Sequence, residues 1–74
     1  MKQSGVRYVI HNPEDNSFCK ISGNGIDWFK NVLDSNLYND QQTADDIRDS
    51  LRVSGYRNIV TVVVNFEKIN ISTI

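Results

Sequence analysis

The stretch that decides the fold is Ile59-Val60-Thr61-Val62-Val63-Val64-Asn65-Phe66-Glu67, near the carboxyl end of this 74-residue chain. Its β-branched and aromatic residues favour a β-strand. We expect one face of the strand to be buried, and that face carries Val60, Val62, Val64 and Phe66. The other face is half apolar and carries Ile59, Thr61, Val63 and Asn65. Apolar residues on both faces are typical of a strand at the centre of a sheet.

A helix is predicted before this strand, from about Asp40 to Val53. Asn39 and Gln42 have the spacing of an N-cap residue and of the glutamine that returns a hydrogen bond to it. Gly55 fits the left-handed position just after a last helical turn. The apolar stripe of the helix consists of Ala44, Ile47 and Leu51. This stripe predicts a helix that packs across one face of the sheet.

A hairpin is predicted at the amino end. Val6 to His11 is rich in β-branched and aromatic residues, a turn that contains proline follows, and Ser17 to Ile21 forms the second strand. Two registers are open, because a slip of one residue exchanges the faces of a strand. A four-residue loop directs Ile10 to the face of Cys19, whereas a five-residue loop directs it to the face of Phe18.

The segments around the helix have weaker signals. Ser22 to Gly25 ends the hairpin, since its glycines and asparagine favour a turn. The spacing of apolar residues then favours a turn of helix near Asp27 to Val32, followed by a short edge strand over Asn36 to Tyr38. An irregular covering loop is the alternative for this region. The tail from Lys68 to Ile74 either frays or extends the last strand.

These elements predict one α+β domain over residues 1–74. Its core is a small antiparallel sheet of three to four strands with one main helix on one face. A chain of this length is close to the size at which a single hydrophobic core becomes marginal. We therefore expect no large enclosed active site, no catalytic group, no metal site and no cofactor.

Charge and composition limit the partners. Eight basic and nine acidic residues give a net charge of −1, so no overall positive field attracts nucleic acid or an anionic membrane. The longest apolar run is too short to span a bilayer, and the amino end lacks the apolar stretch of a signal peptide. The lone Cys19 cannot form an internal disulfide. The cytoplasm is the expected compartment.

Candidate binding residues lie on the predicted helix and beside the predicted strands. Three aspartates make the helix surface acidic, which is typical of a solvated face and also of a surface for a basic partner. No histidine or cysteine joins them for a metal site, and Arg48 and Arg52 lie within pairing distance. Trp28 is either an interface anchor or a lid on the core. The predicted partner-binding residues are Asp45, Asp46, Asp49, Trp28, Tyr56 and Arg57.

The sequence also contains candidate residues for two further chemistries. Cys19 and His11 form a catalytic pair only if they come within hydrogen-bond reach, and a buried structural thiol is the commoner role of such a cysteine. Basic and aromatic residues on one sheet face would bind RNA or single-stranded DNA by stacking. The residues for that second chemistry are Arg7, Lys20, Arg57 and Lys68, with Tyr8, Phe18 and Tyr56.

Segments spread over nearly the whole chain share one pattern, namely Arg7-Tyr8-Val9-Ile10, Phe18-Cys19-Lys20, a lone Trp28, Leu37-Tyr38-Asn39 and Gly55-Tyr56-Arg57-Asn58-Ile59-Val60. The pattern resembles small phage and prophage proteins of unknown function, which begin with a Tyr-Val-Ile hairpin and end with a helix and a strand. This resemblance implies an accessory protein that binds host or phage machinery. We therefore predict a non-enzymatic binding protein that inhibits or modulates a host protein, with nucleic-acid binding on the sheet as the alternative.

Self-association along a strand edge is also predicted. The last strand is apolar on both faces, and one helix stripe covers only one of them. Open sheet edges also expose unpaired backbone groups. A homodimer or a partner strand would satisfy both demands. The competing arrangement is a monomer in which the second face is covered by Trp28, Phe29, Val32 and Leu33.

Overall fold

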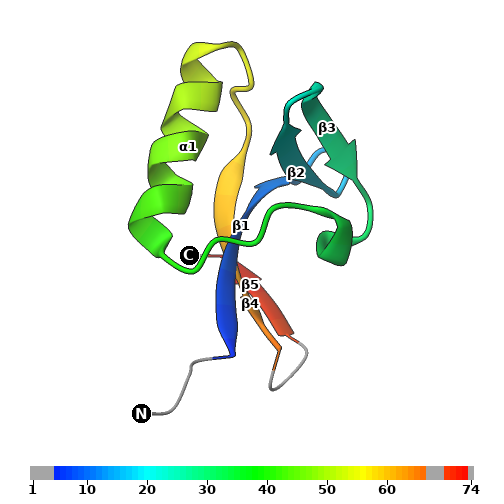
Figure 1. The fold of residues 1–74 in the computed structure, drawn as a ribbon, viewed down its shortest axis with the longest axis vertical. Coiled ribbons are helices and arrows are strands. Elements are labelled where there is room, and N and C mark those ends of the chain that lie inside the picture. The colour runs from blue at the N-terminus through cyan, green and yellow to red at the C-terminus, as the bar shows by residue number, and fades with distance from the viewer. Residues whose placement is uncertain (1–4, 67–69, 74) are drawn as a thin grey trace.

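The computed structural model describes residues 5–66 and 70–73. It contains a five-stranded antiparallel sheet in the order β3-β2-β1-β4-β5, with one long helix packed on one face (Figure 1). The elements in chain order are β1 (Val6–Asn12), β2 (Ser17–Ser22), β3 (Gly25–Phe29), the 3-10 helix η1 (Val32–Asp34), α1 (Gln41–Val53), β4 (Val60–Asn65) and β5 (Asn70–Thr73). The predicted α+β class is confirmed. Among the described residues, no helix has the length and apolar character that a bilayer span requires.

The sheet has one strand more than the predicted maximum of four, because part of the tail pairs with β4. β5 runs antiparallel to β4, with Val62 opposite Thr73 and Asn65 opposite Asn70. The tail therefore neither continues β4 nor frays over residues 70–73. Lys68 and Ile74, which also belong to the predicted tail, lie outside the described residues.

The predicted central strand, β4, lies inside the sheet between β1 and β5. It pairs with β1 along its whole length, from Val6 opposite Asn65 to His11 opposite Val60. Val62 is 2% exposed, whereas Phe66, just beyond the strand, is 40% exposed. The predicted buried face is therefore buried within the strand and opens to solvent at its end.

The core consists of two clusters, one on each face of the sheet. The helix covers the cluster formed by Ile10, Cys19, Leu51 and Ile59, with Ile26, Trp28, Tyr38 and Ile47 packed against it. The opposite cluster is formed by Val9, Phe18, Val62 and Val64, with Val32, Leu37 and Val60 packed against it. Both faces of β4 are thus covered within the chain. Of the residues expected to cover the second face, Val32 does so, but Trp28 packs on the helix side and Leu33 is 63% exposed.

The hairpin of β1 and β2 has the shorter of the two predicted loops. His11 lies opposite Phe18 and Asn12 opposite Ser17, which leaves residues 13–16 as the loop. Asn16 ends this loop with a φ of 53°, a left-handed conformation that asparagine tolerates. Ile10 therefore shares a face with Cys19, as the four-residue alternative requires.

The prediction of a helical turn near Asp27 to Val32 is wrong, because Gly25–Phe29 forms strand β3. Gly23 and Asn24 form a two-residue turn, so that Ser22 pairs with Gly25 and β3 folds back on β2. This pairing uses the edge of β2 that β1 leaves free. A single turn of 3-10 helix does form later, at Val32–Asp34, where the side chain of Asn31 accepts a hydrogen bond from the Leu33 amide.

The predicted edge strand over Asn36 to Tyr38 is instead an isolated bridge inside the sheet. β1 and β2 pair only near their turn, and the segment lies between them where they diverge. Tyr38 exchanges two backbone hydrogen bonds with Tyr8, at 2.7 and 2.8 Å, and the Asn36 amide donates to the Cys19 carbonyl. This prediction is wrong because residues 36–38 form hydrogen bonds with backbone groups of β1 and β2 at the place where these two strands diverge and do not pair with each other.

The helix begins at Gln41, one residue later than predicted, because Asp40 and not Asn39 is the N-cap. The Asp40 carboxylate accepts hydrogen bonds from the amide and hydroxyl of Thr43. At the other end, the amides of Gly55 and Tyr56 donate to the carbonyls of Arg52 and Leu51, at 3.1 and 3.0 Å. Gly55 has the predicted positive φ, 115°. These bonds complete a Schellman motif, which turns the chain sharply towards β4.

Candidate protein-binding surface

An aromatic pair connects the helix end to the β2–β3 hairpin. The ring centroids of Trp28 and Tyr56 lie 5.6 Å apart. Cross-strand pairing places Trp28 opposite Cys19 and Ile26 opposite Ile21, so these residues share the helix-side face of the hairpin. Tyr56 is 36% exposed and Ile21 39% exposed, while Ile26 and Trp28 are half-buried. We call Ile21, Ile26, Trp28 and Tyr56 the aromatic surface.

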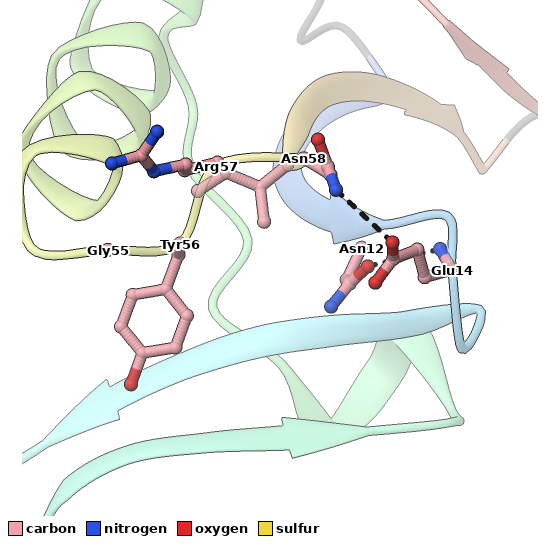
Figure 2. A pocket seen from close by; sticks show the side chains of 7 residues that line it. Asn12, Glu14, Gly55, Tyr56, Arg57 and Asn58 are labelled. Atoms are coloured by element: carbon pink, nitrogen blue, oxygen red, sulfur yellow. Dashed lines mark hydrogen bonds between the residues drawn. The ribbon is translucent and has the colours of Figure 1, made fainter.

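A polar pocket of about 330 Å³ adjoins the aromatic surface and shares Tyr56 with it (Figure 2). The pocket is lined by Asn12, Glu14, Gly55, Tyr56, Arg57, Asn58 and Ile59. Asn58 donates to the Glu14 carboxylate at 3.2 Å, and the Asn12 side chain accepts from the Glu14 amide at 3.1 Å. The first bond ties the β1–β2 turn to the loop before β4, and the second lies within that turn.

Tyr56 and Arg57 point in different directions from this loop. Figure 2 shows the Tyr56 ring directed towards the β2–β3 hairpin and the Arg57 side chain directed towards α1. Arg57 is exposed, and its guanidinium forms no hydrogen bond or ion pair within the described part of the chain. Of the six predicted partner-binding residues, the fold therefore brings together Trp28 and Tyr56, whereas Arg57 follows Tyr56 in the chain and points away from this pair.

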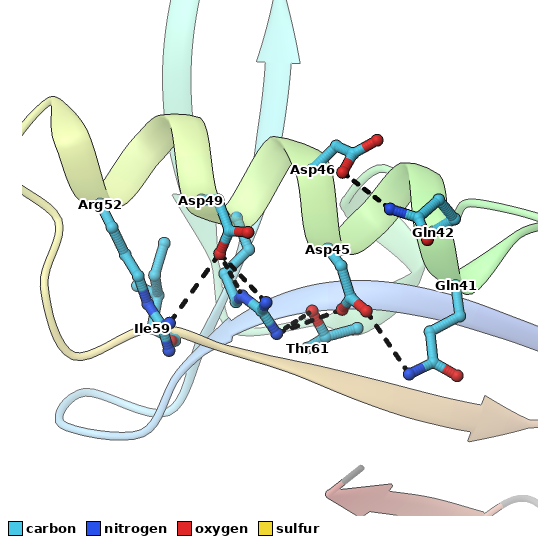
Figure 3. A network of polar contacts seen from close by, with 9 residues as sticks. Gln41, Gln42, Asp45, Asp46, Asp49, Arg52, Ile59 and Thr61 are labelled. Atoms are coloured by element: carbon cyan, nitrogen blue, oxygen red, sulfur yellow. Dashed lines mark hydrogen bonds and ion pairs between the residues drawn. The ribbon is translucent and has the colours of Figure 1, made fainter.

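The remaining predicted residues, the three helix aspartates, are engaged by their own helix (Figure 3). Arg48 forms ion pairs with Asp45 at 3.1 Å and with Asp49 at 3.0 Å, and Arg52 approaches Asp49 at 3.9 Å. The Asp46 carboxylate accepts a hydrogen bond from Gln42 at 2.9 Å. The pairing expected from sequence is confirmed. The described residues hold no group of three side chains suited to a metal ion.

The two arginines of this network also join the helix to β4. Arg48 donates to the hydroxyl of Thr61 at 3.4 Å, and Arg52 donates to the carbonyl of Ile59 at 2.8 Å. The aspartates hold both guanidinium groups in position for these bonds. The acidic helix face thus has a structural role in attaching α1 to the sheet.

Cys19 and His11 do not form a catalytic pair. Since His11 lies opposite Phe18, its side chain is on the other face of the sheet from that of Cys19. The His11 ring stacks on Phe18 with centroids 4.8 Å apart, and its Nε2 lies 3.0 Å from the side-chain oxygen of Asn16. Cys19 is 2% exposed, and burial raises the pKa of its thiol to about 11. The burial of this thiol, predicted from the sequence, is confirmed.

The residues expected to stack nucleic-acid bases are divided between different parts of the fold. Arg7 and Tyr8 are neighbours in β1, so their side chains lie on opposite faces of the sheet. Phe18 is 5% exposed within the core, and Lys68 lies outside the described residues. The described aromatic and basic side chains therefore do not gather on one open face.

Comparison with protein-family models, curated proteins and solved structures gave no match for this chain. The candidate surface is accordingly assigned from the geometry of this chain and not from a related protein. The sequence pattern did not predict Ile21 and Ile26 as members of that surface, because it favoured a helical turn in the region of β3. The signal that would have found them is the Gly23-Asn24 pair between two alternating runs, which is typical of a two-residue hairpin turn.

Proposed function

We propose that this chain is a non-enzymatic binding protein that contacts a larger protein through its aromatic surface and Arg57. The observation that carries the proposal is the partly exposed Trp28–Tyr56 pair, and Arg57, which follows Tyr56 in the chain, is exposed and unpaired among the described residues. Tryptophan, tyrosine and arginine are the residue types most enriched at interface hot spots. Partly buried aromatic rings also lose little conformational freedom when a partner covers them.

The chemistry of the buried groups supports binding rather than catalysis. The thiol of Cys19, the single cysteine, is enclosed and its pKa is raised by burial, and the imidazole of His11, the single histidine, lies on the other face of the sheet. The resemblance to small phage proteins supports a host or phage protein in the cytoplasm as the partner, which this chain would inhibit or modulate. The genes beside the reading frame test that origin, since a locus without phage genes would remove its support.

A capture experiment with matched variants tests the binding surface. Immobilised wild-type protein, Tyr56→Ser and Leu33→Ser are each exposed to lysate of the native cell or host. Leu33→Ser is the control, because Leu33 is 63% exposed and lies outside the aromatic surface. We expect a protein that wild type and Leu33→Ser retain and Tyr56→Ser loses.

Retention of no protein, or of the same proteins by all three variants, would contradict the proposal. Circular dichroism of each variant confirms that the helix and sheet are intact. The alternative, single-stranded nucleic-acid binding, predicts retention that falls as salt concentration rises. Oligonucleotide titrations of the labelled protein that leave every amide shift unchanged would rule it out.

A further inference from the structure

The sheet ends at β3, whose outer edge is open. Among the described strands, β3 pairs with β2 alone, and Figure 1 shows no further strand beside it. The backbone groups of residues 25–29 form no hydrogen bonds with described residues outside this pairing. Unpaired N–H and C=O groups on such an edge are a template for another extended chain.

The side chains of β3 alternate between two faces of different chemistry. Ile26 and Trp28 belong to the aromatic surface, whereas Asp27 lies on the opposite face and is exposed. Lys20 is the cross-strand neighbour of Asp27, but no ion pair joins these two described residues. The Asp27 carboxylate therefore lies at the middle of the open edge and forms no ion pair with a described residue, and its neighbours in sequence, Ile26 and Trp28, are apolar and half-buried on the other face.

We propose that β3 binds an extended segment of a partner protein as an added strand, and that this segment has a basic residue between two apolar residues. The inference rests on the proposed function, because it specifies how that partner docks. The basic side chain lies opposite Asp27. The flanking apolar side chains point to the other face, where they lie beside Ile26 and Trp28 and extend the aromatic surface.

A second copy of this chain fits the same edge less well. Antiparallel pairing of β3 with itself about its middle residue places Asp27 of one copy directly opposite Asp27 of the other. Like charges directly opposite in a sheet destabilise the pairing. Shifting the register removes this contact but leaves part of the strand unpaired. The edge therefore favours a chain of different sequence, with a positive charge at the central position.

Two short peptides test the inference on the full chain. Thr-Val-Lys-Val-Thr and Thr-Val-Glu-Val-Thr, with blocked ends, are titrated into isotope-labelled protein, and amide shifts and hydrogen exchange are followed. We expect the lysine peptide to shift and protect amides within Gly25–Phe29, and the glutamate peptide to bind about two- to fivefold more weakly. Asp27→Lys, a change at an exposed site, reverses this preference. A fully N-methylated lysine peptide, which cannot donate to the ladder, loses binding.

Each other outcome overturns strand addition at β3. Equal binding of both peptides, or an unchanged preference in Asp27→Lys, would show that the Asp27 carboxylate does not select a basic residue in the added strand. Shifts at Trp28 and Tyr56 without slower exchange in β3 contradict the edge but support the aromatic surface. Protection of β3 when the protein alone is concentrated assigns the edge to a second copy. Absence of any shift contradicts the edge, while the Tyr56→Ser capture experiment judges the proposed function separately.

Discussion

The burial of Cys19 leads to a prediction about stability in alkaline solution. Its thiol pKa rises from an ordinary value of 9.0 to about 11 in the folded chain. As pH rises through this window, the unfolded state loses the thiol proton before the folded state does. The contribution of Cys19 to stability is therefore full below pH 9 and lost by about pH 11.

Denaturant unfolding across that pH range measures the effect. We expect the free energy of unfolding of wild type to fall more steeply with pH than that of Cys19→Ala. The substitution also leaves a small cavity. This cavity lowers the free energy of unfolding by the same amount at every pH, so it does not affect the comparison of the two slopes. Parallel pH profiles for the two proteins would show that the thiol does not ionise differently in the folded and unfolded states.

At the scale of elements, the junction between α1 and β4 depends on one backbone conformation. Gly55 has a φ of 115°, and a Cβ at this position would meet no atom within 4 Å. The cost of Gly55→Ala is thus backbone strain rather than a clash, and we expect a loss of about 1–2 kcal/mol in the free energy of unfolding.

Gly23→Ala is the matched control for this junction. A Cβ at Gly23 also meets nothing within 4 Å, and its φ lies outside the positive range. We expect this substitution to change the free energy of unfolding much less, because only the strained position differs. Equal losses in the two variants would indicate that the Schellman turn does not depend on glycine.

At the scale of the whole molecule, self-association stays a prediction. Because both faces of β4 are covered within the chain, the structure limits this prediction to the edges of the sheet. Val32 and Leu37 cover the face that one helix could not, so uncovered faces no longer favour a dimer. Among the described strands, two have an open edge, β3 and β5. Because Asp27 opposes self-pairing of β3, we expect copies to pair through β5.

Light scattering and hydrogen exchange over a concentration series test this pairing. The expected result is a mass that rises above 8.5 kDa at high concentration, with protection gained in β5. Asp27→Lys is the control, and it leaves the mass profile unchanged if β3 takes no part. A mass that stays at 8.5 kDa throughout would remove the support for self-association.

The sequence by itself determined the elements whose signals are local. Helix α1 follows from an apolar stripe, an N-terminal cap and Gly55, all within one segment of chain. The strand β4 follows from its run of β-branched residues, and the hairpin of β1 and β2 from a proline turn between two such runs. The burial of Cys19 also follows from residue type. Each of these interactions joins residues that are close in sequence or depends on one side chain.

Only the tertiary structure decided what fills the edges and faces that these elements leave open. Residues 25–29 pair with the free edge of β2 as strand β3, although the spacing of apolar residues in this region is typical of a helical turn. Tyr38 lies between β1 and β2 and pairs with Tyr8, and the ring of Trp28 contacts the ring of Tyr56. These contacts join distant parts of the chain, and their stability depends on which backbone groups and apolar faces remain unpaired after the local elements form. Periodicity within one segment carries no information about that competition.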